Sequence, residues 1–253
     1  TYIPIGIIRP ILIAVWAFPC LLFDSANSLA EGTTSLYHAA EMSITADELK
    51  RHVDILADDS FEGRASGSQG GRAASGYLRE QLEKIGAKPM GDDGDYFQYF
   101  RNNWRNILAC IPGTDPQLKE EYILLSAHYD HVGYGTQRTS YGPTGYIHNG
   151  ADDNASGTSA LLELVEAMQM AGCRRSILFA FWDGEEQGLL GSKHFIQNPV
   201  VPLAQIRALM NMDMVGRLRD HKLTVFGSRT LPGSRRLVSE QNEGSPLSID
   251  FSW

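Results

Sequence analysis

Short continuous apolar runs alternate with segments of helical spacing through most of the chain, and this alternation restricts the fold more than any other feature. A run such as Tyr122–Ala127 is typical of a strand buried on both faces of a sheet. Strands alternating with helices predict an α/β fold with three α-β-α layers, in which a mainly parallel mixed sheet has helices on both faces. We expect further strands at 107–111, 176–182, 206–212 and 223–226, and helices at 45–57, 73–85, 156–170, 188–196 and 233–240.

The first thirty residues differ from the rest of the chain in their pattern of apolar and polar residues. The apolar run Ile11–Phe23 is short for a membrane span, and Ser28 and Ala30 are small residues of the kind that a signal peptidase requires. This pattern predicts a signal peptide that is cleaved after Ala30, with an uncleaved N-terminal anchor as the alternative. Only Arg9 supplies charge before the run and no Met begins the chain, so we expect the chain to be trimmed at its start.

The predicted organisation is a signal peptide over 1–30, a linker over 31–43 and one domain over 44–253. A chain with a cleaved signal is secreted or periplasmic, and its mature part has no stable membrane insertion. The net charge of -8 is spread along the sequence without a basic patch, which argues against nucleic acid and anionic membranes as partners. Cys20 would leave with the signal, while Cys110 and Cys173 either pair or remain buried thiols.

Polar residues follow the predicted strands at the points where ligands gather in a sheet of this kind. His128 comes directly after the run 122–127, and Asp130 could hold its imidazole tautomer; taken alone, such a histidine is usually structural. Asp152 and Asp153 precede the helix predicted from Ser156. Capping of that helix would explain one of these acids and not both.

Two further acidic positions follow later strands. Glu185 and Glu186 are adjacent carboxylates that repel each other unless a cation or a proton lies beside them, the alternative being a solvated turn. Asp213 lies in an apolar strand, where it needs a metal or an arginine such as Arg217 as its partner. One histidine and several carboxylates at successive strand ends suit Zn²⁺, and a shared aspartate would allow two ions a few ångströms apart.

These residues resemble the co-catalytic di-zinc exopeptidases, which include secreted leucyl-type aminopeptidases and, more distantly, glutamate carboxypeptidases. The resemblance covers roughly 44–226 and includes Glu62-Gly63-Arg64 before the main motifs. It is carried by Ala127-His128-Tyr129-Asp130-His131-Val132-Gly133, by Asn149-Gly150-Ala151-Asp152-Asp153-Asn154-Ala155-Ser156-Gly157, by Glu185-Glu186-Gln187-Gly188-Leu189-Leu190-Gly191-Ser192 and by Asn211-Met212-Asp213.

The resemblance implies a role for each matched residue. Asp152 would bridge two Zn²⁺ ions, His128 and Asp213 would complete opposite sides, and Glu186 would be a terminal ligand. Asp130 would orient His128, and Glu185 would be the general acid and base. A nearby unligated glutamate fits that last role, because it can accept a proton from water and deliver it to the leaving amine.

One departure from the family pattern concerns a further histidine ligand, usually in a Ser-Asp-His type sequence downstream. His221 is the only histidine after Asp213, and it lies in Arg219-Asp220-His221-Lys222, which is typical of an exposed turn. We therefore expect the second zinc site to lack its last histidine in this chain and the domain to be incomplete at its C-terminus. We also expect these residues alone to be inactive or weakened as an enzyme.

The leading functional hypothesis is a zinc aminopeptidase that acts on peptides with a free N-terminus. Residues 86–121 are too few to hold the inserted domain of the glutamate-carboxypeptidase-like relatives. One alternative is a non-catalytic binding domain on the same fold, against which the retained Glu185 argues. Another is an acyltransferase of the glutaminyl-cyclase kind, which would use one zinc ion.

Overall fold

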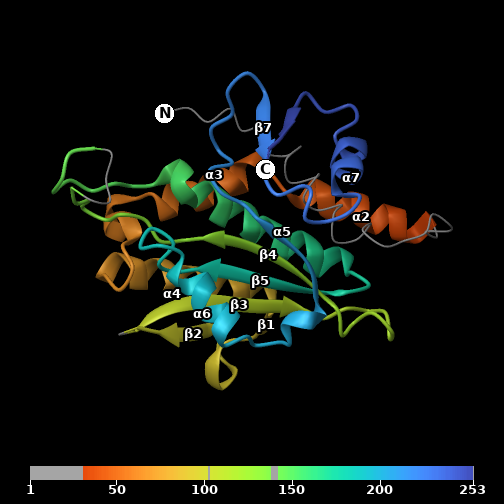
Figure 1. The fold of residues 1–253 in the computed structure, drawn as a ribbon, viewed down its shortest axis with the longest axis horizontal. Helices are drawn as coiled ribbons and strands as arrows, with labels where there is room; N and C mark the ends of the chain where they lie inside the picture. Colours follow the sequence, from red (N-terminus) through yellow and green to blue (C-terminus); the bar gives the residue numbers. More distant parts are fainter. Residues whose placement is uncertain (1–30, 102, 138–141, 253) are drawn as a thin grey trace.

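A computed structural model describes residues 31–101, 103–137 and 142–252 (Figure 1). Its helices are α2 (Glu31–Ser43), α3 (Ala46–Leu56), α4 (Gln69–Ile85), α5 (Gly157–Ala171), α6 (Leu190–Gln197) and α7 (Ser234–Gln241). Its strands are β1 (Lys88–Pro89), β2 (Phe97–Phe100), β3 (Trp104–Ile111), β4 (Tyr122–His128), β5 (Ser176–Trp182), β6 (Ile206–Asn211), β7 (Lys222–Val225) and β8 (Ser248–Phe251). Short helical turns are η2 (Asp59–Arg64), η3 (Asp92–Gly94), η4 (Ala151–Ser156) and η5 (Leu203–Gln205).

The main sheet is mixed and has the strand order β1-β3-β5-β4-β6, with β2 paired to β3. Strand β4 is parallel to both β5 and β6, whereas β3 is antiparallel to β5, β1 and β2. The parallel strands β5, β4 and β6 therefore end at the same edge of the sheet, which is where the sequence places its candidate ligands.

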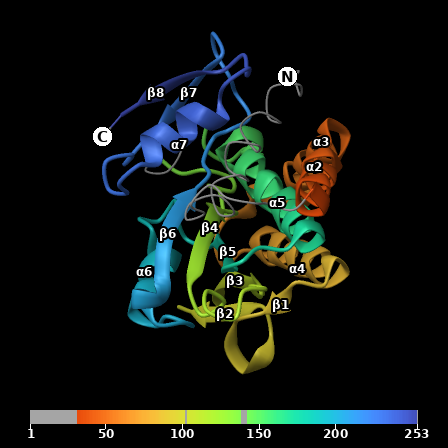
Figure 2. The same cartoon turned by 90° about the vertical axis from the view of Figure 1, so that its right-hand side faces the viewer.

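Helices cover both faces of this sheet, as expected (Figure 2). On one face the apolar side chains of α3, α4 and α5 pack against alternate residues of the central strands, such as Leu125 and Phe179. On the other face α6 supplies Phe195, which packs with Leu124 and Leu178. Both faces of β4 and β5 are thus buried, and the continuous apolar runs of these strands follow from that burial.

One helix of the structure was not predicted, and another begins earlier than the sequence pattern indicated. Segment 31–43, which we expected to be a linker, is the helix α2, and its Ala40 is fully buried in the core shared with α5. Helix α4 begins at Gln69 with Ser68 as its N-cap, four residues before the expected start. Gly70 lies so close to the carbonyl oxygen of Phe61 that no side chain fits there, which explains a glycine inside this helix.

The C-terminal part forms a separate small layer. Strands β7 and β8 pair in parallel with each other and do not join the main sheet. The strand expected at 223–226 is therefore present, close to its predicted bounds, but outside the sheet that carries the site.

Several expectations concern residues or bonds beyond the sheet. The predicted signal peptide and Cys20 lie outside the described residues. In the described part, no helix has the length and apolar character needed to cross a membrane. Cys110 and Cys173 are both buried thiols that are not joined to each other, and burial raises the pKa of Cys110 to about 11.

Candidate metal centre

Four of the predicted site residues, together with Asp153, lie close to one another at the carboxyl ends of the three parallel strands. His128 is the last residue of β4, and Asp213 follows the end of β6 by two residues. Glu185 and Glu186 lie in the loop after β5, and η4 brings Asp153 to the same place from the N-terminal end of α5. The topology therefore gathers residues that are far apart in the sequence.

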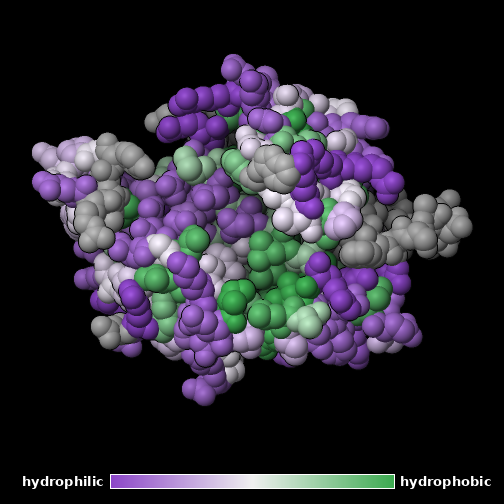
Figure 3. Space-filling view, viewed as in Figure 1, coloured by the Kyte–Doolittle hydropathy of each residue, from purple (hydrophilic) through white to green (hydrophobic). Residues whose placement is uncertain are grey.

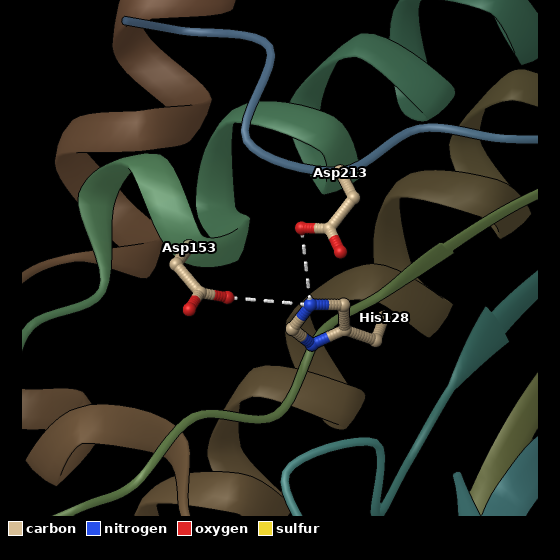
Figure 4. A group of neighbouring side chains, drawn as sticks. All are labelled: His128, Asp153 and Asp213. Carbon is tan, nitrogen blue, oxygen red and sulfur yellow. Dashed lines mark ion pairs between the residues drawn. The ribbon is translucent and has the colours of Figure 1, made fainter. Parts of the chain in front are cut away.

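His128 lies between two carboxylates (Figure 4). Its Nε2 atom is 3.3 Å from Oδ1 of Asp153 and 3.4 Å from Oδ1 of Asp213. The imidazole is 2% exposed, and burial alone would lower its pKa, but Asp130, Asp153 and Asp213 together raise that pKa to about 12. The carboxylates around this ring therefore stabilise a positive charge there, which a proton or a metal ion can supply.

A second group of possible ligands contains His131, Asp153 and Glu186. In each group the nitrogen and oxygen donors lie within 4.8 Å of one another, and Asp153 belongs to both groups. Burial raises the pKa of Asp153, but its contact with His128 and the nearby charges of His131 and Arg64 outweigh this effect and lower it. Asp153 is thus held as an anion between the two groups.

Asp152, the expected bridging residue, belongs to neither group. Its Oδ1 atom accepts a hydrogen bond from the backbone N–H of Gly216 at 2.9 Å, and its Oδ2 atom is 3.9 Å from Nε of Arg217. The backbone of Asp153 is not helical, with φ of -103° and ψ of 98°, and this turns its side chain in a different direction from that of Asp152. The structure places Asp153 beside His128 and uses Asp152 to tie the segment after β6 to η4.

Asp130 holds the loop after β5 more directly than it holds His128. Its Oδ1 atom accepts from the backbone N–H of Glu185 at 3.1 Å, and its Oδ2 atom accepts from that of Glu186 at 3.3 Å and from the Ser66 hydroxyl at 3.1 Å. The carboxylate is 3.7 Å from Nδ1 of His128, whose nearer neighbour is the Asp130 carbonyl oxygen at 3.2 Å. Asp130 therefore fixes the position of both glutamates.

Glu185 is half-buried beside the two groups and belongs to neither of them. Burial raises the pKa of its carboxyl, and the negative charges of Asp130, Glu186 and Asp213 act in the same direction. A carboxyl group with a raised pKa is suited to exchange protons near neutral pH.

Arg64 was not singled out as a functional residue by the sequence, although it lies in one of the matched motifs. Its side chain is fully buried and donates to the carbonyl oxygens of Leu56, Tyr129, Asn149 and Gly150. It thereby joins the two ends of the connection between β4 and η4, which the backbone hydrogen bond from His148 to the carbonyl oxygen of Gly133 also links. The guanidinium thus helps to hold His128, at the end of β4, close to Asp153 in η4.

An apolar groove adjoins the site on the α6 side of the sheet. It has a volume of about 240 Å³ and is lined partly by Trp182, Leu189, Ile196 and Leu209, next to His128 and Glu185. Exposed apolar surface is visible at the centre of this face of the molecule (Figure 3). His221 is exposed and is in neither ligand group.

Comparison with known proteins identifies the family. Residues 106–247, more than half of the chain, match the pattern described as peptidase family M28. The chain belongs to this family. The region of this M28 chain that matches includes His128, Asp153, Glu185, Glu186 and Asp213.

Two curated relatives and one solved structure give the extent of the likeness. A probable leucine aminopeptidase of Arthroderma otae is 29% identical over 193 residues, which are 73% of this chain and 48% of that protein. Leupeptin-inactivating enzyme 1 of Streptomyces exfoliatus is 30% identical over 217 residues, 81% of this chain and 44% of that protein. The M28 chain thus spans about half the length of the curated relatives it matches.

The solved structure is a Zn-dependent exopeptidase from Parabacteroides distasonis, with a TM-score of 0.61 at 21% identity. The likeness covers 83% of this chain and 77% of that one. At this level of identity the likeness shows a shared fold, and it confirms the predicted α/β architecture.

Proposed function

We propose that the protein is a zinc-dependent aminopeptidase whose site holds two zinc ions. The observation that carries this proposal is that Asp153 is shared by two groups of possible ligands at the ends of the parallel strands. His128 and Asp213 would complete the first site, and Glu186 would bind the second ion. Relatives named as leucine aminopeptidases and a fold neighbour described as Zn-dependent support this choice.

The spacing of the first group fits zinc. Two donors bound to one tetrahedral ion at bond lengths of 2.0–2.1 Å lie roughly 3.3 Å apart. Nε2 of His128 lies 3.3 Å from the Asp153 oxygen and 3.4 Å from the Asp213 oxygen. The donor set of one imidazole and two carboxylates is also one that zinc takes in catalytic sites.

The chain's own residues would then handle protons and position the substrate. When bound, the zinc ions supply Lewis acidity for the scissile carbonyl and for the attacking water. Glu185 takes a proton from that water on its carboxylate and passes it to the leaving amine. Asp130 holds Glu185 in place by accepting a hydrogen bond from the backbone N–H of Glu185.

The apolar groove suggests which substrates are preferred. Its four large apolar side chains begin beside His128 and Glu185, so an apolar side chain of the N-terminal residue could be buried there. We expect the protein to hydrolyse a leucyl anilide faster than an aspartyl anilide.

The roles of the acids can be separated with the purified, zinc-loaded protein. We expect Glu185→Gln to lose at least about 100-fold in kcat while two zinc ions remain bound, because an amide cannot accept the proton. Glu166→Gln, an exposed change on α5, is the matched control. Asp153→Asn should lose zinc, whereas Asp152→Asn should retain it, since Asp152 lies in neither ligand group.

Several results would refute the proposal. One is full activity of Glu185→Gln; another is equal hydrolysis of aminoacyl anilides and their N-acetyl forms, since the N-acetyl forms lack the free amine. One zinc ion per chain together with cyclisation of an N-terminal glutamine would point to the acyltransferase alternative instead.

A further inference from the structure

His131 and Glu186 form the shortest contact between side chains of the two ligand groups. The imidazole Nδ1 atom of His131 lies 2.7 Å from Oε1 of Glu186, and both side chains are largely buried. The two residues come from the loops after β4 and β5, 55 positions apart in the sequence. This contact leaves open whether His131 is a metal ligand or a hydrogen-bond partner of one.

The distance favours the hydrogen bond. Two donors on one zinc ion lie roughly 3.3 Å apart, as the donors around His128 do. The 2.7 Å between His131 and Glu186 is shorter than that spacing and is the length of a charge-assisted hydrogen bond. Because an ionised carboxylate only accepts, Nδ1 of His131 must carry the hydrogen and is not available as a ligand atom.

The imidazole of His131 is held in this orientation by its surroundings. Its backbone N–H donates to the carbonyl oxygen of Arg64 at 3.2 Å. The ring lies against Gly150, where a side-chain Cβ would come within 2.6 Å of two ring carbons. Arg64 in turn donates to the carbonyl oxygen of Gly150 at 2.9 Å, so the ring lies between the two ends of the connection from β4 to η4, which Arg64 ties together.

Glu186 is consequently held at both of its ends. Its backbone N–H donates to Asp130 at 3.3 Å, and its Oε1 atom accepts from His131, which leaves Oε2 for a metal ion. A carboxylate fixed in this way loses little conformational freedom when it binds a metal, and such supporting hydrogen bonds typically change metal affinity by 10–100-fold.

We propose that His131 is a positioning residue for the second zinc ion: it donates from Nδ1 to Glu186 and is not itself the histidine ligand of that ion. This inference rests on the proposed function, because it takes Glu186 as a zinc ligand. It adds a residue to the support of the site that the expected ligand set does not contain.

The test compares three substitutions at this position by zinc stoichiometry and by competition with a chelator. His131→Ala removes the hydrogen bond, and we expect two zinc ions at saturation with the weaker one bound about 10–100-fold less tightly. His131→Asn places an amide N–H where Nδ1 was and should restore most of that affinity. His131→Gln places its amide near the position of Nε2 and should restore less, and His38→Ala on the exposed side of α2 is the control.

Other outcomes would contradict either the inference or the proposed function on which it rests. If His131→Ala and His131→Asn both bound only one zinc ion at any zinc concentration, His131 would be a ligand and the inference would be wrong. Unchanged zinc affinity in His131→Ala would show that the hydrogen bond has no positioning role. A wild-type protein without zinc would instead contradict the proposed function, before any substitution is considered.

Discussion

Replacement of Arg64 by methionine tests how the two ends of the connection between β4 and η4 are held together at the site. Arg64 is 0% exposed and donates four hydrogen bonds to backbone carbonyls, of which those to Asn149 and Gly150 belong to the loop before η4. Methionine is long and flexible enough to fill much of the same space without donating. The substitution therefore removes the hydrogen bonds and leaves most of the packing.

The expected magnitude follows from two opposing contributions. Four hydrogen bonds from a charged group contribute about 1.5–3 kcal/mol each, or about 6–12 kcal/mol together. Burial lowers the pKa of the guanidinium to about 10 from 12.5, which corresponds to a cost of about 3 kcal/mol for the charged form. Since water reaches part of the freed carbonyls, we expect a net loss near the low end, about 4 kcal/mol.

Urea unfolding of Arg64→Met and the wild type, with a chelator present, measures this loss without a contribution from zinc. Arg72→Met is the matched control, because Arg72 is exposed and its side chain donates to the carbonyl oxygen of Gly67 alone among the described residues. With zinc in excess the difference from the wild type should grow, as the end of β4 that carries His128 separates from the turn η4 that carries Asp153. A free energy of unfolding within 1 kcal/mol of the wild type would refute the role assigned to Arg64.

Three further predictions concern other parts of the same region. Burial and the nearby Asp130 raise the pKa of Asp183 to about 6 from 3.8, so the wild type loses stability as the pH rises through 6. Asp183→Asn cannot ionise at this position. In urea unfolding with chelator present, the free energy of unfolding of this variant should therefore rise by up to about 3 kcal/mol relative to the wild type between about pH 4 and pH 8. An unchanged difference across that range would contradict the assignment. Gly150→Ala should weaken zinc binding and lower the free energy of unfolding more than Gly86→Ala does. Both positions have positive φ, but only the side chain at Gly150 would meet the His131 ring. Equal losses of zinc affinity in chelator competition and of stability in unfolding for the two variants would refute the close packing. Cys110 should react with a thiol reagent at pH 8 only after denaturation, since it is buried with a raised pKa, and fast reaction of the native protein would show that it is accessible.

The sequence predicted those parts of the fold in which one local pattern determines the structure. The runs 122–127 and 176–182 are strands at nearly the predicted bounds, because both of their faces are buried and the apolar run is continuous. Helix α2 was missed because, among its described side chains at 36–43, Ala40 alone is buried, while the exposed Leu36 and Met42 give no clear apolar stripe. The position of β7 and β8 outside the main sheet depends on pairing between distant segments, which no local pattern reveals.

The assignment of the shared acid shows where reasoning from sequence reaches its limit. Asp152 and Asp153 are identical in type and adjacent, so composition and spacing cannot distinguish them. What distinguishes them is the direction of each side chain in η4: Asp153 faces His128, and Asp152 faces the backbone of Gly216. That direction is fixed by contacts from the segment after β6, including the hydrogen bond from Asn154 Nδ2 to the carbonyl oxygen of Met212 at 3.0 Å. The local sequence brings two acids to the end of the sheet, and a segment some sixty positions later determines which of them can serve as the shared ligand.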